Sequence, residues 1–308
     1  MRYAIISDIH GNYPALAAVL ADAKAQGAGM FLFLGDYVNS YPYGNEVAET
    51  LQNIENAIII RGNNEDYLRN LSGQDQRTWT RKQFAPIYWS YRSLTPENLH
   101  YLSSLPEEAT VSDPGGDINL IHASAVFFRP GNRIEAFYSE VYKERMQEAP
   151  FTHEEYLEYA KDEVLSRSDV LTDICALPPG VYLFGHNHLP FHMEYEGRYF
   201  VNPGSCGQPL TGDTSAPYTL LEHTSAGWKV TERWVPYDMT ELLTRLRDPQ
   251  ITSYPLMWRD IFERSLATGL DYMQVFVNHL RDQALLHGEE TMPYSNKVLD
   301  AAIKTWEV

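Results

Sequence analysis

Cysteine and long apolar runs are scarce in this chain of 308 residues. Its two cysteines, Cys175 and Cys206, are too few for a disulfide framework. No run of about 18 apolar residues occurs, and the first residues resemble a short strand more than a signal peptide. These absences exclude a disulfide-rich secreted scaffold, and we expect a cytoplasmic protein without a membrane span.

Positive charge is also in short supply. Lysine and arginine number 24 against 41 aspartates and glutamates, which gives a formal net charge of −17. Long nucleic acids are bound mainly through lysine and arginine, so we expect no such partner. A small phosphorylated substrate is compatible with this charge, since two divalent cations would reverse its sign locally. The oligomeric state cannot be read from the sequence.

The chain is long enough for one large domain with an appendage. Residues 1–122 alternate between apolar strand patterns and helical patterns. Short strands separated by glycine and proline follow over residues 181–235. In the first part, helices are expected at about 14–26, 45–54 and 64–71, and residues 78–105 should be helical, with Thr95-Pro96 as a helix start.

Two helical regions complete the expected organisation. Residues 123–178 should form a largely helical insert, because Thr152-His-Glu-Glu155 fits a capping box. Helical spacing returns after Asp238, at about 239–247, 257–287 and 295–306. We therefore expect a main domain over residues 1–237 and a C-terminal helical extension over residues 238–308.

Side chains that can bind metals follow five short apolar strands. These donors are Asp8, His10, Asp36, Asn63, His122, His186 and His188. In α/β sheets, functional sites collect at the carboxyl ends of strands. Divalent ions such as Mn²⁺, Fe²⁺ and Zn²⁺ accept mixed imidazole and carboxylate ligands, so the pattern predicts a metal site.

Taken in order, these motifs resemble those of the calcineurin-like metallophosphoesterases. The motifs are Asp8-Ile-His10, Gly35-Asp36, Gly62-Asn63-Asn64-Glu65, the isolated His122 and Gly185-His186-Asn187-His188. The phrase from Asn202 to Pro209 also resembles a stretch of the family's bacterial branch, which includes phosphodiesterases and dinucleoside polyphosphatases. The resemblance covers residues 1 to about 235. It implies an α/β fold, a four-layer α/β/β/α sandwich of two mixed sheets flanked by helices.

The resemblance also implies a dinuclear centre with a metal-bound hydroxide as nucleophile. It places Asp8, His10 and His188 on one ion, Asn63, His122 and His186 on the other, and Asp36 as the bridge between both. Mn²⁺ is the first choice for the ions, with Fe, Zn, Ni or Mg as alternatives. Two other roles stay open. Asn63 could instead cap the following helix. Glu65 is either a first-turn carboxylate or an acceptor for a ligand histidine.

The chain departs from the family pattern at two positions. Many family members have a histidine after the Gly-Asn pair, where this chain has Asn64. We count Asp36 and Asn64 as the catalytic candidates, yet asparagine cannot transfer a proton at neutral pH. The lost proton transfer would be worth roughly 10²–10⁴-fold in rate, so we expect substrates with good leaving groups. The second departure is Ala123, which follows His122 where glycine is usual.

Three residues are candidates for substrate contacts. Tyr41 follows the Gly-Asp motif and could stack on a nucleobase or aryl group, or pack within its loop. Arg129 and Arg133 follow His122 in the insert. They could clamp a distal phosphate or be ordinary surface charges.

The sequence therefore predicts a metal-dependent phosphoesterase acting on small nucleotide-like substrates such as dinucleoside polyphosphates. Two alternatives remain open. One is a serine/threonine protein phosphatase, and the other is a non-catalytic scaffold that binds metals. The substitution at Asn64 is the only feature of the sequence that favours the scaffold.

Overall fold

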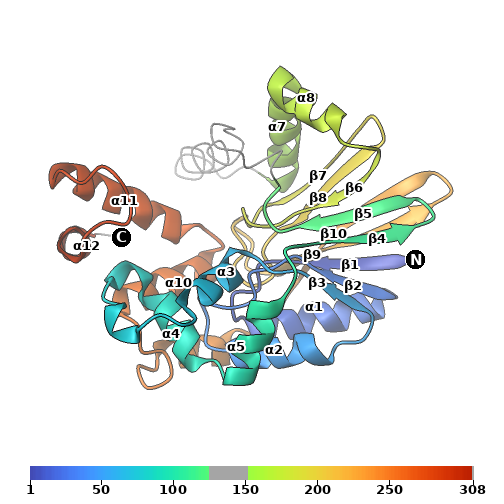
Figure 1. Ribbon diagram of the computed structural model, residues 1–308. Coiled ribbons are helices and arrows are strands. Elements are labelled where there is room, and N and C mark those ends of the chain that lie inside the picture. The colour runs from blue at the N-terminus through green and yellow to red at the C-terminus, as the bar shows by residue number, and fades with distance from the viewer. Residues whose placement is uncertain (125–151, 307–308) are drawn as a thin grey trace.

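Two five-stranded sheets face each other, and helices cover both outer faces (Figure 1). The computed structural model describes residues 1–124 and 152–306. The core between the sheets includes Ile5, Leu32, Leu120 and Leu183, which are buried. This arrangement confirms the expected four-layer α/β/β/α sandwich.

The first sheet combines three parallel and two antiparallel strands. Its order is β10 (Gly227–Val235), β9 (Ala216–Thr224), β1 (Arg2–Ile6), β2 (Met30–Phe33) and β3 (Ala57–Ile59). β1, β2 and β3 are parallel, while β9 and β10 run antiparallel to their neighbours. The three parallel strands therefore end at one edge, where the first half of the expected donors follows.

The second sheet is also mixed. Its order is β4 (Glu108–Asp113), β5 (Gly116–Ile121), β6 (Gly180–Leu183), β8 (Arg198–Pro203) and β7 (Pro190–Tyr195). β5, β6 and β8 are parallel, and β4 and β7 pair antiparallel at the two edges. The sequence patterns did not reveal β4, because only Ala109 and Val111 of this edge strand are apolar, and both are only half-buried against the core between the sheets.

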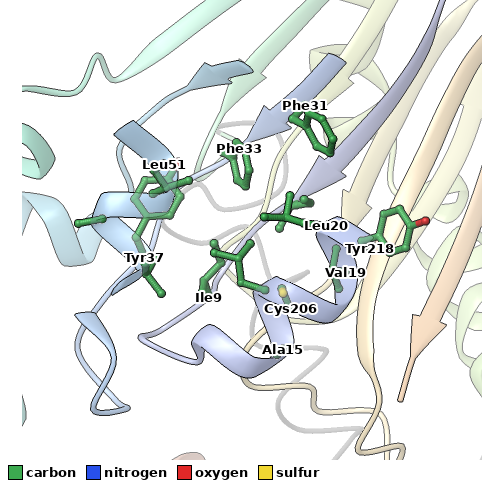
Figure 2. Packing of buried hydrophobic residues seen from close by; sticks show 14 of the residues in the cluster. Ile9, Ala15, Val19, Leu20, Phe31, Phe33, Tyr37, Leu51, Cys206 and Tyr218 are labelled. Carbon is green, nitrogen blue, oxygen red and sulfur yellow. The ribbon is translucent and has the colours of Figure 1, made fainter. Parts of the chain in front are cut away.

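The helical layers pack on the two sheets as expected. α1 (Tyr13–Ala25), α2 (Gly44–Asn53) and α5 (Pro96–Ser104) share a buried cluster with the first sheet. Figure 2 shows Phe31 and Phe33 of β2 close to Val19 and Leu20 of α1. The insert helices α7 (His153–Ser166) and α8 (Ser168–Ala176) pack on the second sheet. The capping box predicted for α7 is present.

The two longest expected helical stretches are divided. Residues 78–105 contain the end of the 3₁₀ turn Gln76–Thr78, the 3₁₀ turn Lys82–Phe84, α4 (Ala85–Ser93) and α5. The helix start expected at Thr95-Pro96 is confirmed, because Thr95 caps α5 and Pro96, which lacks an N–H, occupies its first turn. The expected helix 257–287 is likewise divided into α10 (Leu256–Thr268) and α11 (Tyr272–Leu286). Gly269, with a positive φ, ends α10.

The C-terminal helices pack against the main domain through a second buried hydrophobic cluster. α9 (Thr240–Arg247), α10, α11 and α12 (Asn296–Thr305) contribute to it. Trp258, Phe262 and Phe276 pack there together with Tyr41 and Trp89. We retain residue 237 as the proposed boundary of the main domain.

No helix in the part of the chain that the structure describes is long and apolar enough to cross a membrane.

Candidate metal centre

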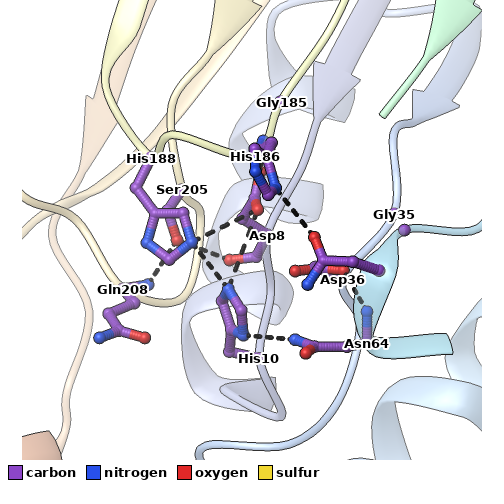
Figure 3. A network of polar contacts seen from close by, with 12 residues as sticks. Asp8, His10, Gly35, Asp36, Asn64, Gly185, His186, His188, Ser205 and Gln208 are labelled. Carbon is purple, nitrogen blue, oxygen red and sulfur yellow. Dashed lines mark hydrogen bonds and ion pairs between the residues drawn. The ribbon is translucent and has the colours of Figure 1, made fainter. Parts of the chain in front are cut away.

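All seven predicted donors lie together at the edge where the parallel strands of both sheets end. Asp8 and His10 follow β1, Asp36 follows β2, and α3 (Asn63–Leu71) begins just after β3 with Asn63. From the second sheet, His122 follows β5, and His186 and His188 follow β6. Figure 3 shows several of these side chains pointing toward one another.

The first group of donors contains Asp8, His10 and His188. The Nε2 atoms of the two histidines are 3.0 Å apart. Asp8 Oδ1 lies 3.4 Å from His188 Nε2 and 3.9 Å from His10 Nε2. This oxygen is buried and has no hydrogen-bond partner among the described residues. A cation bound at the usual ~2.0–2.1 Å from each imidazole would satisfy all three atoms.

The second group contains Asn63, His122 and His186, with Asp36 beside it. Asn63 Oδ1 lies 3.0 Å from His122 Nε2 and 2.8 Å from His186 Nδ1. His122 Nδ1 lies 2.7 Å from the carbonyl oxygen of Leu34, so this nitrogen carries the proton and donates it. In the neutral ring, the lone pair on His122 Nε2 then faces the oxygens of Asn63 and Asp36. With this tautomer, a cation between these atoms would be bound by several acceptors at once.

The two groups are contiguous. Ligand atoms of Asp8, His10 and His188 lie within 4.8 Å of one another, and so do those of Asp8, Asp36 and His122. The donor set of imidazole, carboxylate and amide oxygen fits divalent ions of the borderline class. Because Asp8 has a ligand atom near His10 and His188 and also near Asp36 and His122, the expected bridging role of Asp36 stays a prediction.

The backbone is strained at this site. Asp8, His10, Asp36, His186 and His188 all have positive φ angles, between 54° and 75°. Left-handed backbone is unfavourable for residues other than glycine and clusters where function requires it. Gly185 shows how closely the loops approach, since a Cβ there would lie 2.1 Å from Ser7 Oγ. The folded loops therefore preorganise the donors at an energetic cost.

A sixth loop, which follows β8, supports the donor loops. Ser205 Oγ donates to the carbonyl oxygen of Asp8 at 2.7 Å, and Gly207 N donates to the same oxygen at 3.0 Å. Asn202 Nδ2 donates to Gly185 O and to Asn187 Oδ1, at 2.9 and 2.8 Å. The motif from Asn202 to Pro209 thus positions the donor loops, a role that the sequence pattern does not predict.

The electrostatic environment favours neutral imidazole at His10. Burial and the neighbouring His188 lower the pKa of His10 to about 4. The ring is therefore neutral near pH 7 and its lone pair is available to a cation.

Glu65 lies in the first turn of α3, as one of the two alternatives held, and its carboxylate also accepts hydrogen bonds from the donor loops. Its Oε2 accepts from Asp36 N at 2.9 Å and from Gly62 N at 2.8 Å, and its Oε1 accepts from Tyr37 N at 2.9 Å. Burial and the charge of Asp36 raise the pKa of Glu65 to about 8, while the N–H donors act in the opposite direction. Glu65 therefore holds the backbone of the donor loops rather than the ring of a histidine.

We expect Glu65→Ala to lower the free energy of unfolding by about 3 kcal/mol or more. Three buried N–H groups would lose their acceptor, and each loss costs about 1–3 kcal/mol. Denaturant unfolding of the variant and of Glu49→Ala, an exposed glutamate of α2, measures the difference. Equal stability of the two variants would contradict this role.

Asn64 is buried beside the first group of donors. Its Nδ2 lies 3.1 Å from His10 Nδ1 and donates to Val38 O at 3.2 Å. Its Oδ1 accepts from Asn39 Nδ2 at 3.2 Å. Asn64 also lines the cavity described below, so it positions His10 next to the space where a substrate would bind.

The structure corrects one expected substrate contact. Tyr41 is fully buried, and its ring lies edge-on against Phe262 at 5.9 Å between centroids. It therefore packs the C-terminal helices onto the main domain and is not available for stacking. Arg129 and Arg133 lie outside the described residues, so their roles stay predictions. Cys206 is buried in the cluster around α1, where it packs among apolar side chains (Figure 2).

A cavity of about 810 Å³ opens over the donor groups. Its floor includes His10, Asp36, Asn63, His186 and His188. Its walls include Tyr67 of α3, Phe84 and Ile87 near α4, and Tyr272 and Met273 of α11. The sequence contained no signal for the contribution of α11, because helical spacing does not tell where a helix packs.

Comparisons with known proteins agree with this geometry. A family model described as the calcineurin-like phosphoesterase superfamily domain matches residues 1–226. The protein MJ0912 of Methanocaldococcus jannaschii, described as uncharacterized, is 27% identical over 259 residues, which is 79% of this chain and 90% of that protein.

Two crystal structures share the fold. A metallophosphoesterase from Sphaerobacter thermophilus is 24% identical, with a TM-score of 0.59 and coverage of 88% of this chain and 99% of that one. The protein PH1004 from Pyrococcus horikoshii is 19% identical, with a TM-score of 0.59 and coverage of 85% and 97%.

Proposed function

Because the chain belongs to the calcineurin-like phosphoesterase superfamily, we propose that it hydrolyses phosphoester or phosphoanhydride bonds at a dinuclear metal centre. The observation that carries this proposal is the convergence of two donor groups on the floor of one cavity. A structural metal site would be expected to be closed by protein ligands on all sides, whereas this one opens to a cavity.

The residues have separable tasks in the proposed reaction. Asp8, His10 and His188 would hold one ion, and Asn63, His122 and His186 the other, with Asp36 between them. Bound divalent ions would supply positive charge for the phosphoryl oxygens and Lewis acidity for the attacking water. Glu65 keeps the Asp36 loop in place, and Asn64 keeps His10 in place. We propose Mn²⁺ as the preferred ion.

We further propose small nucleotide-like substrates, with dinucleoside polyphosphates among them. The cavity volume is within the range of about 300–1,000 Å³ that is usual for small-molecule sites. The C-terminal helix α11 forms part of its wall, which favours a small molecule over the surface of a folded protein. A protein phosphatase is therefore the weaker alternative, and long nucleic acid is disfavoured by the net charge of −17.

The proposal predicts hydrolysis of a simple phosphodiester or phosphomonoester when Mn²⁺ is added. We expect turnover of bis-p-nitrophenyl phosphate, p-nitrophenyl phosphate or both, loss of turnover with a chelator, and recovery when Mn²⁺ is returned. His188→Ala should lose this activity. His287→Ala, at the far end of α11 and outside both donor groups, should retain it.

These measurements distinguish the proposed phosphoesterase from a scaffold and from a protein phosphatase. A protein that is stabilised by Mn²⁺ but hydrolyses neither ester would be a metal-binding scaffold. Turnover restricted to phosphoserine or phosphothreonine peptides would favour the protein phosphatase. Activity that survives complete removal of divalent ions would overturn the proposed metal centre.

A further inference from the structure

The cavity has a second end that the donor groups do not occupy. Phe84 and Ile87 contribute to it from the region of α4, and Tyr272, Met273 and Val277 contribute from α11. All five side chains are half-buried, so they retain surface that faces the open space. The α11 side lies beyond the residues that match the family model, so the family resemblance does not account for it.

This apolar wall, meaning Phe84, Ile87, Tyr272, Met273 and Val277, has a charge pattern unlike that of the floor. Among the described residues that line the cavity outside the donor groups, Asp271 is the only charged side chain, and none is a lysine or arginine. An anionic phosphate would find no cationic side chain here. A neutral apolar or aromatic group would bury its surface against the wall instead.

The turn that carries the apolar wall is tied to the donor loops. Gly269, between α10 and α11, has a φ of +67°, and a Cβ there would lie 2.8 Å from the carbonyl oxygen of Asp213. Gly212 N donates to Gly269 O at 2.9 Å. The same stretch of chain begins with Ser205, which donates to Asp8 O. One short, hydrogen-bonded segment therefore links the wall to the floor.

We infer that the apolar wall is the binding subsite for the uncharged aromatic part of the substrate, which is the nucleobase in the class proposed above. This inference rests on the proposed function for its choice of substrate. Tyr272 is the aromatic side chain of α11 at this subsite and offers a face on which a base can stack. The C-terminal extension then selects the substrate, while the two sheets supply the metal ligands.

Binding of adenosine to the complete protein tests the subsite without any hydrolysis, because adenosine has no phosphate. We expect measurable binding, and we expect Tyr272→Ala to weaken it by about 5- to 100-fold, the range for loss of one stacking partner. Leu286→Ala changes an exposed residue on the same helix that does not line the cavity, and it should leave binding unchanged. Unchanged unfolding midpoints would show that both variants fold.

A second measurement separates the subsite from the metal floor. Tyr272→Ala should raise KM for p-nitrophenyl phosphate but leave inhibition by inorganic phosphate unchanged, since phosphate needs only the floor. Failure of the native protein to bind adenosine, or equal binding by native protein and Tyr272→Ala, would overturn the inference. Adenosine binding that depends on Tyr272 in a protein without hydrolytic activity would support the subsite and contradict only the proposed function.

Discussion

Replacing Asp36 by alanine is expected to release both metal ions and to abolish metal-dependent hydrolysis. Asp36 Oδ1 lies 3.5 Å from His122 Nε2, and Asp36 shares one donor group with Asp8 and His122. The loss should exceed the roughly 10–100-fold that removal of an outer hydrogen-bond partner of a metal ligand costs. Metal content after dialysis and kcat/KM for p-nitrophenyl phosphate measure it.

Two further variants identify the bridging carboxylate and provide a control. Asp8→Ala should lose one ion and keep the other if Asp36 is the bridge. The opposite result, with both ions lost from Asp8→Ala and one retained by Asp36→Ala, would make Asp8 the bridge, because Asp8 also lies close to Asp36 and His122. Asp75→Ala removes an exposed carboxylate paired with Arg77 and should keep the metal content and activity of the native protein.

The second large effect concerns the leaving group. The Asn64 amide contacts His10 and lines the cavity, and it cannot transfer a proton at neutral pH. A leaving group of low pKa, such as an aryl oxide or a nucleotide phosphate, departs without a proton, whereas an alkoxide requires one. We expect anhydrides and aryl esters to react faster than alkyl esters by up to the roughly 10²–10⁴-fold that general acids provide. The measurement is kcat/KM across a series of leaving-group pKa values.

Substitutions at the same position provide the comparison. Asn64→His introduces a proton donor and should flatten the dependence on leaving-group pKa. Asn64→Ala should lower the rate through the lost contact with His10 but keep the steep dependence. A flat series in the native protein would contradict the idea and direct attention to Tyr67, a phenol on α3 that lines the same cavity. Tyr67→Phe would then steepen the series.

The sequence by itself determined the donors and the strands that carry them. Each of the five strands is a short apolar run, and its donor follows within a few residues, so the relation between fold and site is local. The resemblance to one family then supplied the sandwich of two mixed sheets, which local patterns do not contain. The predicted capping box of α7 was confirmed for the same reason, since both of its bonds join residues three positions apart.

Only the tertiary structure decided the roles that depend on distant contacts. Tyr41 is buried by Phe262, more than 200 residues later in the chain, and Glu65 accepts bonds from the loop that contains Asp36. No periodicity or motif records such pairs. The place of α11 was decided in the same way, because the turn at Gly269 and its bond from Gly212 direct the helix over the cavity. Local residue patterns therefore specified the donor groups on the floor of the cavity, while packing between distant segments specified the wall opposite it.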